Sequence, residues 1–311
     1  METTRTVLVD IPEKELLGII EVLTPQKIAT FCDVTDLKAD TKEEKIAKIV
    51  GWAKDYGCAS VCVNPVEVDS LAPMLRGSDV KECYVIDFPL GRLSVEMKAK
   101  QAEDVVRRSR RLRGESGKVE LDMVMNVGYF KRDPTYTKRE IESVVTAADG
   151  EWVKVIIRSS ELTEDEIRLA CRIVKEAGAR FVKNSTGMDP FGAFPEHIRL
   201  MRETVGSDMG VKAAGGIKDA MTVVRLIYAG AKESELRTPS RFRIGTSTPV
   251  NIISTMGWLN YAAQGWVEAG VIPCTICPHN YTSKQRTETR EIYTRRCRDC
   301  PYNKFRKDKD F

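Results

Sequence analysis

The sequence lacks the features that would place the protein in a membrane or a secretory pathway. No apolar stretch approaches the ~20 residues that a transmembrane helix needs. The first residues, M-E-T-T-R-T-V-L-V-D, contain no signal-peptide core. We therefore expect a cytoplasmic protein with no membrane partner.

A strong charge of one sign is also missing. The 311 residues carry 49 basic and 45 acidic side chains, and the formal net charge of +4 is too weak by itself to indicate a nucleic-acid partner. Apolar residues make up 42% of the chain and charged residues 30%, which is ordinary for a globular protein. The length suits one large α/β domain with an appendage.

Two short apolar runs of the same design each deliver one lysine. Phe181–Gly187 reads F-V-K-N-S-T-G, and Gly210–Gly216 reads G-V-K-A-A-G-G. Each run is too short for a helix and fits a buried parallel strand. A helix predicted over 195–204 joins them into a βαβ unit, which places Lys183 and Lys212 at the same end of neighbouring strands.

A buried lysine pair has a chemical use. Two close ammonium groups repel each other, and both a like charge and desolvation lower the pKa of a lysine, so one of the pair can lose its proton. A neutral lysine attacks carbonyl groups and forms Schiff bases. The residues alone therefore indicate carbonyl chemistry on a β/α scaffold, with two unrelated surface lysines as the alternative.

From residue 31 the chain repeats one pattern, a short apolar strand followed by a helix. Capping boxes that begin at Thr41, Thr137 and Thr163 predict three of the helix starts. Eight strand–helix units over 31–269 predict a (β/α)8 TIM barrel, a fold that needs about 250 residues. A doubly wound open sheet is the alternative, but no dinucleotide-type glycine fingerprint follows the first strand. The predicted strands span 31–37, 59–64, 83–89, 119–126, 152–157, 181–187, 210–216 and 241–247.

The two ends of the chain lie outside this repeat. An amphipathic helix is predicted over 11–28, with Pro12 at its N-terminus. We therefore divide the chain into an N-terminal helical extension (1–30), a barrel domain (31–269) and a C-terminal tail (270–311).

In such a barrel the chemistry lies at the C-terminal ends of the strands, which gathers Asp33, Asp122, Lys183 and Lys212 at one mouth. Asp122 lies in an apolar strand, where an unpaired carboxylate is costly. We interpret it as a proton carrier, with a structural ion pair to one of the lysines as the alternative. Asp33 either pairs with Lys212 and extends the proton path or serves only as a turn or cap residue.

Glycines and hydroxyl residues end the seventh and eighth strands. Backbone N–H groups freed by glycine, together with hydroxyls at a helix N-terminus, make an anion site, and phosphate sites in barrels often form from these last two loops. Glycines that only make turns are the alternative. The candidate phosphate-binding residues are Gly187, Gly215, Gly216, Gly245, Ser247 and Thr248.

An ordered set of motifs resembles one known family, the deoxyribose-phosphate aldolases. The motifs are S-V-C-V-N-P, V-I-D-F-P-L-G, E-L-D-M-V-M-N-V-G, K-V-I-I, F-V-K-N-S-T-G, G-V-K-A-A-G-G-I-K and R-I-G-T-S, from about Asp33 to Thr248. The resemblance implies a class I aldolase that reversibly cleaves 2-deoxy-D-ribose 5-phosphate to D-glyceraldehyde 3-phosphate and acetaldehyde. It implies no metal or other cofactor for catalysis.

The resemblance also implies roles for single residues. Lys183 resembles the Schiff-base lysine, and Lys212 resembles its activating neighbour. Asp122 resembles the general acid/base, working through a water, and Asp33 a partner in the proton relay. Two glycines and Ser247 resemble phosphate ligands. We expect a small phosphorylated sugar or aldehyde as substrate and a homo-oligomeric assembly. The alternatives are a Schiff-base lyase for another sugar or keto substrate, and a non-catalytic barrel scaffold with a partner-binding zinc tail.

Three positions depart from the pattern usual in that family. Asn184 follows the candidate Schiff-base lysine where threonine is usual, and Arg158 ends the fifth strand where glutamate is common. Asp87 stands in the third strand where glycine is expected.

The tail follows no part of the barrel pattern. Cys274, Cys277, Cys297 and Cys300 form C-x2-C-x19-C-x2-C, a spacing that suits four thiolates around a tetrahedral zinc. An iron–sulfur cluster is the alternative. We predict a structural zinc, because the tail has little apolar content and metal binding would have to supply its folding energy. Its basic residues would allow a nucleic-acid contact, but we favour docking on the barrel or on a neighbouring subunit.

Overall fold

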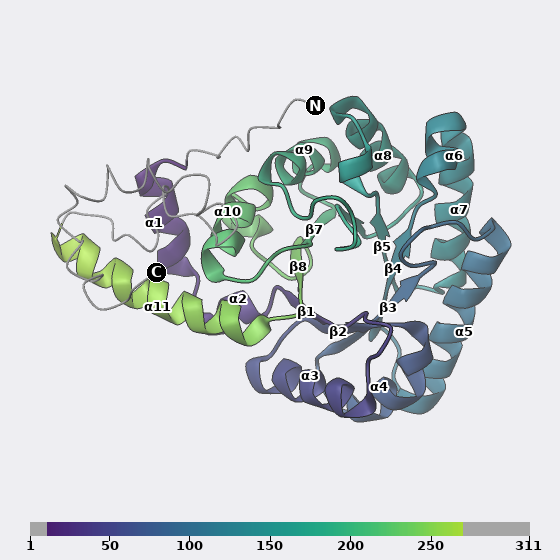
Figure 1. Cartoon of the computed structure of the whole chain (residues 1–311), viewed down its shortest axis with the longest axis horizontal. Helices are drawn as coiled ribbons and strands as arrows, with labels where there is room; N and C mark the ends of the chain where they lie inside the picture. Colours follow the sequence, from purple (N-terminus) through teal and green to yellow (C-terminus); the bar gives the residue numbers. More distant parts are fainter. Residues whose placement is uncertain (1–10, 270–311) are drawn as a thin grey trace.

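The computed structural model describes residues 11–269, and its centre is a closed barrel of eight parallel strands (Figure 1). The strands follow one another around the barrel in chain order, and β1 closes it by pairing with β8. The predicted (β/α)8 architecture is confirmed, and the open-sheet alternative is wrong. The strands are β1 Cys32–Thr35, β2 Ser60–Val63, β3 Lys81–Ile86, β4 Val119–Val124, β5 Trp152–Ile156, β6 Phe181–Lys183, β7 Gly210–Ala214 and β8 Phe242–Thr246.

Helices surround the barrel on its outer face (Figure 1). None of those within 11–269 is long and apolar enough to cross a membrane. The helices that follow the strands are α3 Glu43–Tyr56, α4 Val68–Met74, α5 Val95–Arg113, α6 Val127–Arg132, α7 Pro134–Ala147, α8 Glu164–Glu176, α9 Pro195–Val205, α10 Ala220–Gly230 and α11 Pro249–Ala269. Three 3-10 turns span η1 Pro65–Glu67, η2 Ser159–Glu161 and η3 Ser234–Leu236.

The single helix predicted over 11–28 is wrong, because this segment forms two helices. These are α1 Glu13–Val22 and α2 Pro25–Ala29. Thr24 has an extended backbone and caps α2, as expected for a residue that precedes proline. Both helices lie beside α11 (Figure 1), where the Asn260 amide nitrogen donates to the carbonyls of Ile20 and Leu23 at 2.8 and 2.9 Å.

Of the three predicted capping boxes, one is confirmed. The Thr163 hydroxyl accepts from the Glu166 backbone N–H, and the Glu166 carboxylate accepts from the Thr163 N–H. The starts predicted at Thr41 and Thr137 are wrong. Helix α3 has no side-chain cap, and α7 begins earlier because Asp133 caps it.

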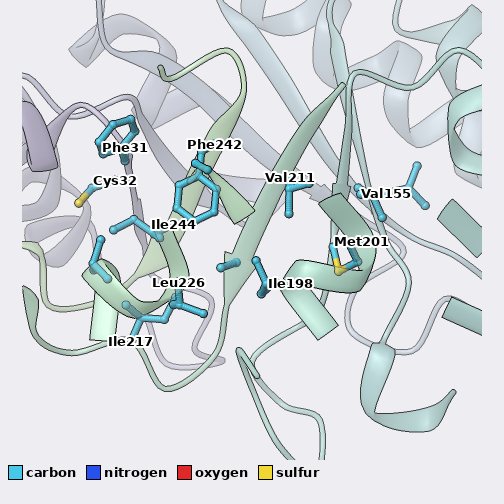
Figure 2. Close-up of a cluster of buried hydrophobic side chains, with 14 of the residues drawn as sticks. Phe31, Cys32, Val155, Ile198, Met201, Val211, Ile217, Leu226, Phe242 and Ile244 are labelled. Carbon is cyan, nitrogen blue, oxygen red and sulfur yellow. The ribbon is translucent and has the colours of Figure 1, made fainter. Parts of the chain in front are cut away.

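The outward faces of the strands form an apolar core with the helices. Burial of each such side chain contributes about 1.5–3 kcal/mol to stability. Because side chains alternate along a strand, an apolar outer face leaves the remaining positions pointing into the barrel. Figure 2 shows part of this core, with Ile198 and Met201 of α9 and Leu226 of α10 near Val211 of β7 and Phe242 and Ile244 of β8.

Candidate active site

Charged side chains gather at the inward positions of the barrel strands. Three are carboxylates and four are cations, and no residue among the seven is more than 2% exposed. A carboxylate or ammonium group is buried at such cost that it must be paired. We call these residues the charge cluster: Asp33, Glu120, Asp122, Lys154, Lys183, Lys212 and Arg243.

Asp122 of β4 lies at the centre of the charge cluster. Its Oδ2 atom accepts a hydrogen bond of 2.7 Å from Lys183 Nζ and another of 2.7 Å from Lys212 Nζ. Its Oδ1 atom accepts from Lys154 Nζ at 2.9 Å. Strand register explains the convergence, because Lys183 pairs with Lys212 across β6 and β7, and Asp122 pairs with Lys154 across β4 and β5. The predicted meeting of the two lysines is confirmed.

The shared carboxylate changes how the lysine charges are balanced. Burial by itself raises the pKa of Asp122, but Lys154, Lys183 and Lys212 hold it well below its usual value. Burial by itself lowers the pKa of Lys212, but Asp122 and Asp33 raise it well above its usual value. Lys212 therefore stays protonated, and its charge is balanced by carboxylates. The prediction that one lysine can lose its proton treated the two lysines as an isolated pair and left out the carboxylates that balance their charges.

Asp33 extends the charge cluster towards β8. Its Oδ2 atom lies 2.5 Å from Lys212 Nζ, and its Oδ1 atom accepts from Arg243 Nη1 at 2.5 Å and from Ser60 Oγ at 2.7 Å. Arg243 also donates to Glu120 Oε1 at 2.8 Å. Asp33 therefore connects the lysines to Arg243 from within β1, which removes the interpretation of this residue as a simple turn or cap.

The pairing of Asp33 predicts a pH-dependent contribution to stability. Burial raises the pKa of Asp33, but Lys212, Arg243 and Lys154 lower it well below its usual value. Asp33→Asn should lower the free energy of unfolding by about 3–5 kcal/mol at neutral pH, because it leaves buried cations short of an anion. The difference should be constant above about pH 5 and shrink below about pH 4, since a depressed folded-state pKa stabilises only while the unfolded group is ionised.

Urea denaturation of both proteins from pH 8 to pH 3 measures this difference. If the stability difference between wild type and Asp33→Asn instead grows as the pH falls, the folded protein favours the protonated carboxyl group. That result would contradict the ion pairing seen around Asp33.

Three members of the charge cluster were not among the site residues predicted from the sequence. Lys154, Glu120 and Arg243 each stand in an otherwise apolar strand pattern, within W-V-K-V-I, V-E-L-D-M-V and F-R-I-G-T. The same feature drew attention to Asp122. A search for charged residues at alternate positions of otherwise apolar strands would therefore have found all of them.

The candidate phosphate-binding residues lie together on one side of the mouth. The loops after β7 and β8 are joined because Thr246 Oγ1 donates to the Ile217 carbonyl at 2.9 Å. Gly216 and Ser247 are exposed at these loops, so their N–H groups and the serine hydroxyl can reach an anion. Gly215 and Gly216 have φ angles of +93° and +76°, which glycine adopts without strain.

The remaining candidates have structural contacts of their own. The Thr248 N–H donates to Thr246 Oγ1 at 3.0 Å, and the Gly187 N–H donates to Ser185 Oγ at 2.8 Å. A Cβ atom on Gly245 would lie 3.3 Å from the Ala214 Cβ atom. These contacts favour the turn and packing interpretation at these three positions. The phosphate-binding prediction therefore depends mainly on Gly215, Gly216 and Ser247.

Asn184, the first departure from the family pattern, ties two mouth loops together. Its amide nitrogen donates to the Gly192 carbonyl at 3.0 Å, and its amide oxygen accepts from the Ala214 N–H at 2.7 Å. The two loops pack backbone against backbone, because a Cβ atom on Gly192 would lie only 2.3 Å from the Gly215 oxygen. Asn184 thus holds the loop after β6 against the loop that carries the candidate glycines Gly215 and Gly216.

The other two departures are also paired. Arg158 Nε donates to Asp189 Oδ1 at 2.6 Å, and Asp189 accepts from the Ser185 hydroxyl at 2.8 Å, so the pair shapes the loop after β6. Asp87 has a φ of +53°, a conformation that aspartate tolerates better than most residues. Its carboxylate lies 3.2 Å from the buried Lys98 ammonium.

The arrangement of these side chains defines a class of protein. The barrel holds buried lysines around one carboxylate, beside the loops that carry the candidate phosphate-binding residues. A lysine there can bond to a carbonyl carbon while the carboxylate moves protons. This is the arrangement of a β/α-barrel lyase that works through a covalent amine intermediate.

Comparison with known proteins identifies the family, although no family model matches the chain. The deoxyribose-phosphate aldolase of Geobacillus sp. (strain WCH70) is 44% identical over 228 residues, which cover 73% of this chain and 94% of the relative. That of Clostridium perfringens (strain SM101 / Type A) is 43% identical over 229 residues, with the same coverage. The chain belongs to the deoxyribose-phosphate aldolase family.

Solved structures agree with this assignment. The deoxyribose phosphate aldolase of Aeropyrum pernix is similar with a TM-score of 0.67 at 28% identity, covering 78% of this chain and 97% of that one. An aldolase called QR15 is similar with a TM-score of 0.64 at 33% identity, covering 73% and 94%.

Proposed function

We propose that the chain is a class I aldolase that reversibly cleaves 2-deoxy-D-ribose 5-phosphate to D-glyceraldehyde 3-phosphate and acetaldehyde. The names of its relatives support the substrate. One observation in the structure supports the chemistry, namely that a single carboxylate oxygen of Asp122 accepts hydrogen bonds from both Lys183 and Lys212.

Lys183 is the proposed nucleophile. The Lys183 ammonium first passes a proton to Asp122, which accepts its hydrogen bond. The resulting amine adds to the aldehyde carbon C1 of the open-chain sugar, the proton returns to the hydroxyl that leaves as water, and an iminium group remains. A base then removes the proton of the C3 hydroxyl, the C2–C3 bond breaks, and the bond electrons pass into the iminium to give a neutral enamine and free glyceraldehyde 3-phosphate. Protonation of the enamine at C2, followed by hydrolysis, releases acetaldehyde and the free amine.

Asp122 is the proposed proton carrier for both transfers. Lys183 is one of three cations that lower the pKa of Asp122. Formation of the neutral enamine removes that positive charge, so the pKa of Asp122 rises when its carboxylate takes up the substrate proton. Protonation of the enamine restores the charge and makes Asp122 a carboxylate again. Lys212, which also contacts Asp33, supplies a constant positive charge beside this exchange.

The rim formed by the partly buried Gly215 and the exposed Gly216 and Ser247 is the proposed phosphate site. It places the anion at the ends of β7 and β8, beside Lys212 and one strand away from Lys183. Binding there would orient the sugar so that its aldehyde end points to the charge cluster. The Asn184 contacts would hold the two loops at a fixed distance during the reaction.

The activity is tested by following release of acetaldehyde and glyceraldehyde 3-phosphate from 2-deoxyribose 5-phosphate with coupled dehydrogenases. Unphosphorylated 2-deoxyribose is the matched control, and we expect it to react with a much lower kcat/KM. No cleavage of the phosphorylated sugar, together with cleavage of another sugar or keto acid phosphate, would replace the substrate while keeping the class of reaction.

A homo-oligomer is proposed on the same basis, because the relative from Aeropyrum pernix is described as tetrameric. Sedimentation equilibrium of the full chain measures the assembly. A single species at the mass of one chain, 35.0 kDa, would contradict it.

We also propose that the tail binds one structural zinc ion per chain. The four ligands, Cys274, Cys277, Cys297 and Cys300, lie outside the described residues, and their spacing is the support for the proposal. Because thiolates compete with protons, the metal should be lost as the pH falls. Truncation after Gly270 should remove the zinc and leave the aldolase rate substantially intact.

Elemental analysis of protein purified without added metal, followed by assay of the truncated chain, makes this test. Iron with sulfide in a brown protein would replace zinc by an iron–sulfur cluster. Four freely alkylated tail cysteines in the folded protein would show that the tail binds no metal.

A further inference from the structure

Two cysteines inside the barrel have no part in the proposed mechanism. Cys62 of β2 and Cys83 of β3 are register partners on neighbouring strands, and both are fully buried. Cys83 Sγ donates to Asp122 Oδ1 at 3.2 Å. The two sulfur atoms and one carboxylate oxygen of Asp122 all lie within 4.8 Å of one another. A soft ligand pair therefore adjoins the carboxylate at the centre of the charge cluster.

The spacing of these three atoms is close to that of a metal site. In a tetrahedral zinc site with Zn–S near 2.3 Å, the ligand atoms lie about 3.5–3.8 Å apart. Closing the triangle on an ion would therefore need movements of about 1 Å, which side-chain rotation can supply. Two thiolates and one carboxylate leave a fourth position for water. We propose that Cys62, Cys83 and Asp122 bind a thiophilic divalent cation of the Zn²⁺ and Cd²⁺ class.

Charge balance allows the ion despite the lysines around it. The charge cluster has four cations and three carboxylates, so its net charge is positive when both thiols are protonated. A divalent cation that binds both sulfurs displaces two thiol protons, so the net charge does not change. Lys154 Nζ donates to Asp122 Oδ1 at 2.9 Å and to Cys83 Sγ at 3.3 Å, and the ion would replace both contacts. Lys154 Nζ also lies 2.7 Å from Glu120 Oε2, and this pairing remains.

The bound ion should inhibit the aldolase. Asp122 has two oxygen atoms for three lysines, and metal coordination removes the basicity that proton transfer needs. The predicted inhibition rests on the proposed function, because it needs Asp122 to carry a proton. The predicted binding of the ion does not, so a failure of the metal site differs from a failure of the proposed function. The two failures can therefore be told apart, because ion binding is measured on the protein without substrate.

The probe is Cd²⁺, added to the full chain, with bound ion counted by equilibrium dialysis and thiolate coordination followed by ultraviolet absorbance. The double variant Cys62→Ser, Cys83→Ser is compared with wild type. Cys171→Ser is the matched control, because Cys171 is equally buried but lies in α8. Any Cd²⁺ held by the tail cysteines is common to all three proteins and cancels in the difference.

We expect wild type and Cys171→Ser to bind one Cd²⁺ more than the double variant. Inhibition, scaled to each protein's own uninhibited rate, should need at least tenfold more Cd²⁺ in the double variant. Cys62→Ala, which keeps one thiol, serves if the double variant fails to fold, and should show the same direction. Equal Cd²⁺ counts in wild type and the cysteine variants would overturn the site. An extra bound ion without inhibition would overturn its contact with Asp122.

Discussion

Lys183→Ala should lower kcat for cleavage of 2-deoxyribose 5-phosphate by about four to six orders of magnitude, the range seen when a covalent nucleophile is removed. Lys183→Arg should lose as much, because the guanidinium group stays protonated and cannot attack a carbonyl. The loss should appear in kcat far more than in KM, since the phosphate rim is unchanged. Lys100→Arg, at an exposed position of α5, is the control and should keep the wild-type rate.

Folding of the two variants can be checked separately. Asp122 keeps its contacts with Lys154 and Lys212 when Lys183 is removed, so the circular dichroism spectrum and melting temperature should stay near those of wild type. Substantial activity in a folded Lys183→Arg protein would show that another amine is the nucleophile. Lys154 would then be the first candidate, because it contacts the same carboxylate.

Asp122→Asn should damage both activity and stability. The amide cannot carry the proton of the C3 hydroxyl, which should lower kcat by about 10² to 10⁴. It also leaves Lys154, Lys183 and Lys212 without the anion that they share, so the free energy of unfolding should fall by about 3–5 kcal/mol near neutral pH. Urea denaturation and steady-state kinetics on the same preparations measure the two effects.

The pH dependence of the unfolding free energy separates the contribution of the Asp122 charge from that of its packing. The three lysines hold the pKa of Asp122 well below its usual value. The stability that its charge provides is therefore complete above the unfolded-state pKa, about 4, and is lost as the pH falls through the folded-state value. The difference in free energy of unfolding between wild type and Asp122→Asn should therefore become smaller below pH 4. A gap that is the same at pH 3 and pH 7 would indicate a packing effect, not a charge effect.

The barrel itself could be predicted from the sequence because its strands are buried on both sides and are separated by helices of regular length. The meeting of Asp33, Asp122, Lys183 and Lys212 was expected at the strand ends of one mouth, but only Lys183 ends its strand. The other three lie within their strands, inside the barrel. How the charges are paired could not be predicted in this way. Which carboxylate meets which lysine depends on strand register, and the bond from Asp122 to Lys212 joins residues 90 positions apart.

Local sequence patterns failed where tertiary contacts dominated. The Thr137 capping box is absent because its glutamate, Glu140, binds the buried Lys98 ammonium at 2.6 Å. Thr163 caps its helix because the Glu166 carboxylate is only partly buried, so it accepts from the Thr163 N–H while it also pairs with Lys131 at 3.3 Å. The tail zinc and the cytoplasmic location stay predictions.

The most direct measurement is the position of the covalent intermediate. Wild-type protein is incubated with 2-deoxyribose 5-phosphate, reduced with borohydride, digested and mapped by mass spectrometry. We predict an ethyl group on Lys183, formed by reduction of the acetaldehyde iminium, and none on Lys154 or Lys212. An adduct on either of those two lysines, or cleavage of the sugar with no trapped lysine, would contradict the proposed role of Lys183.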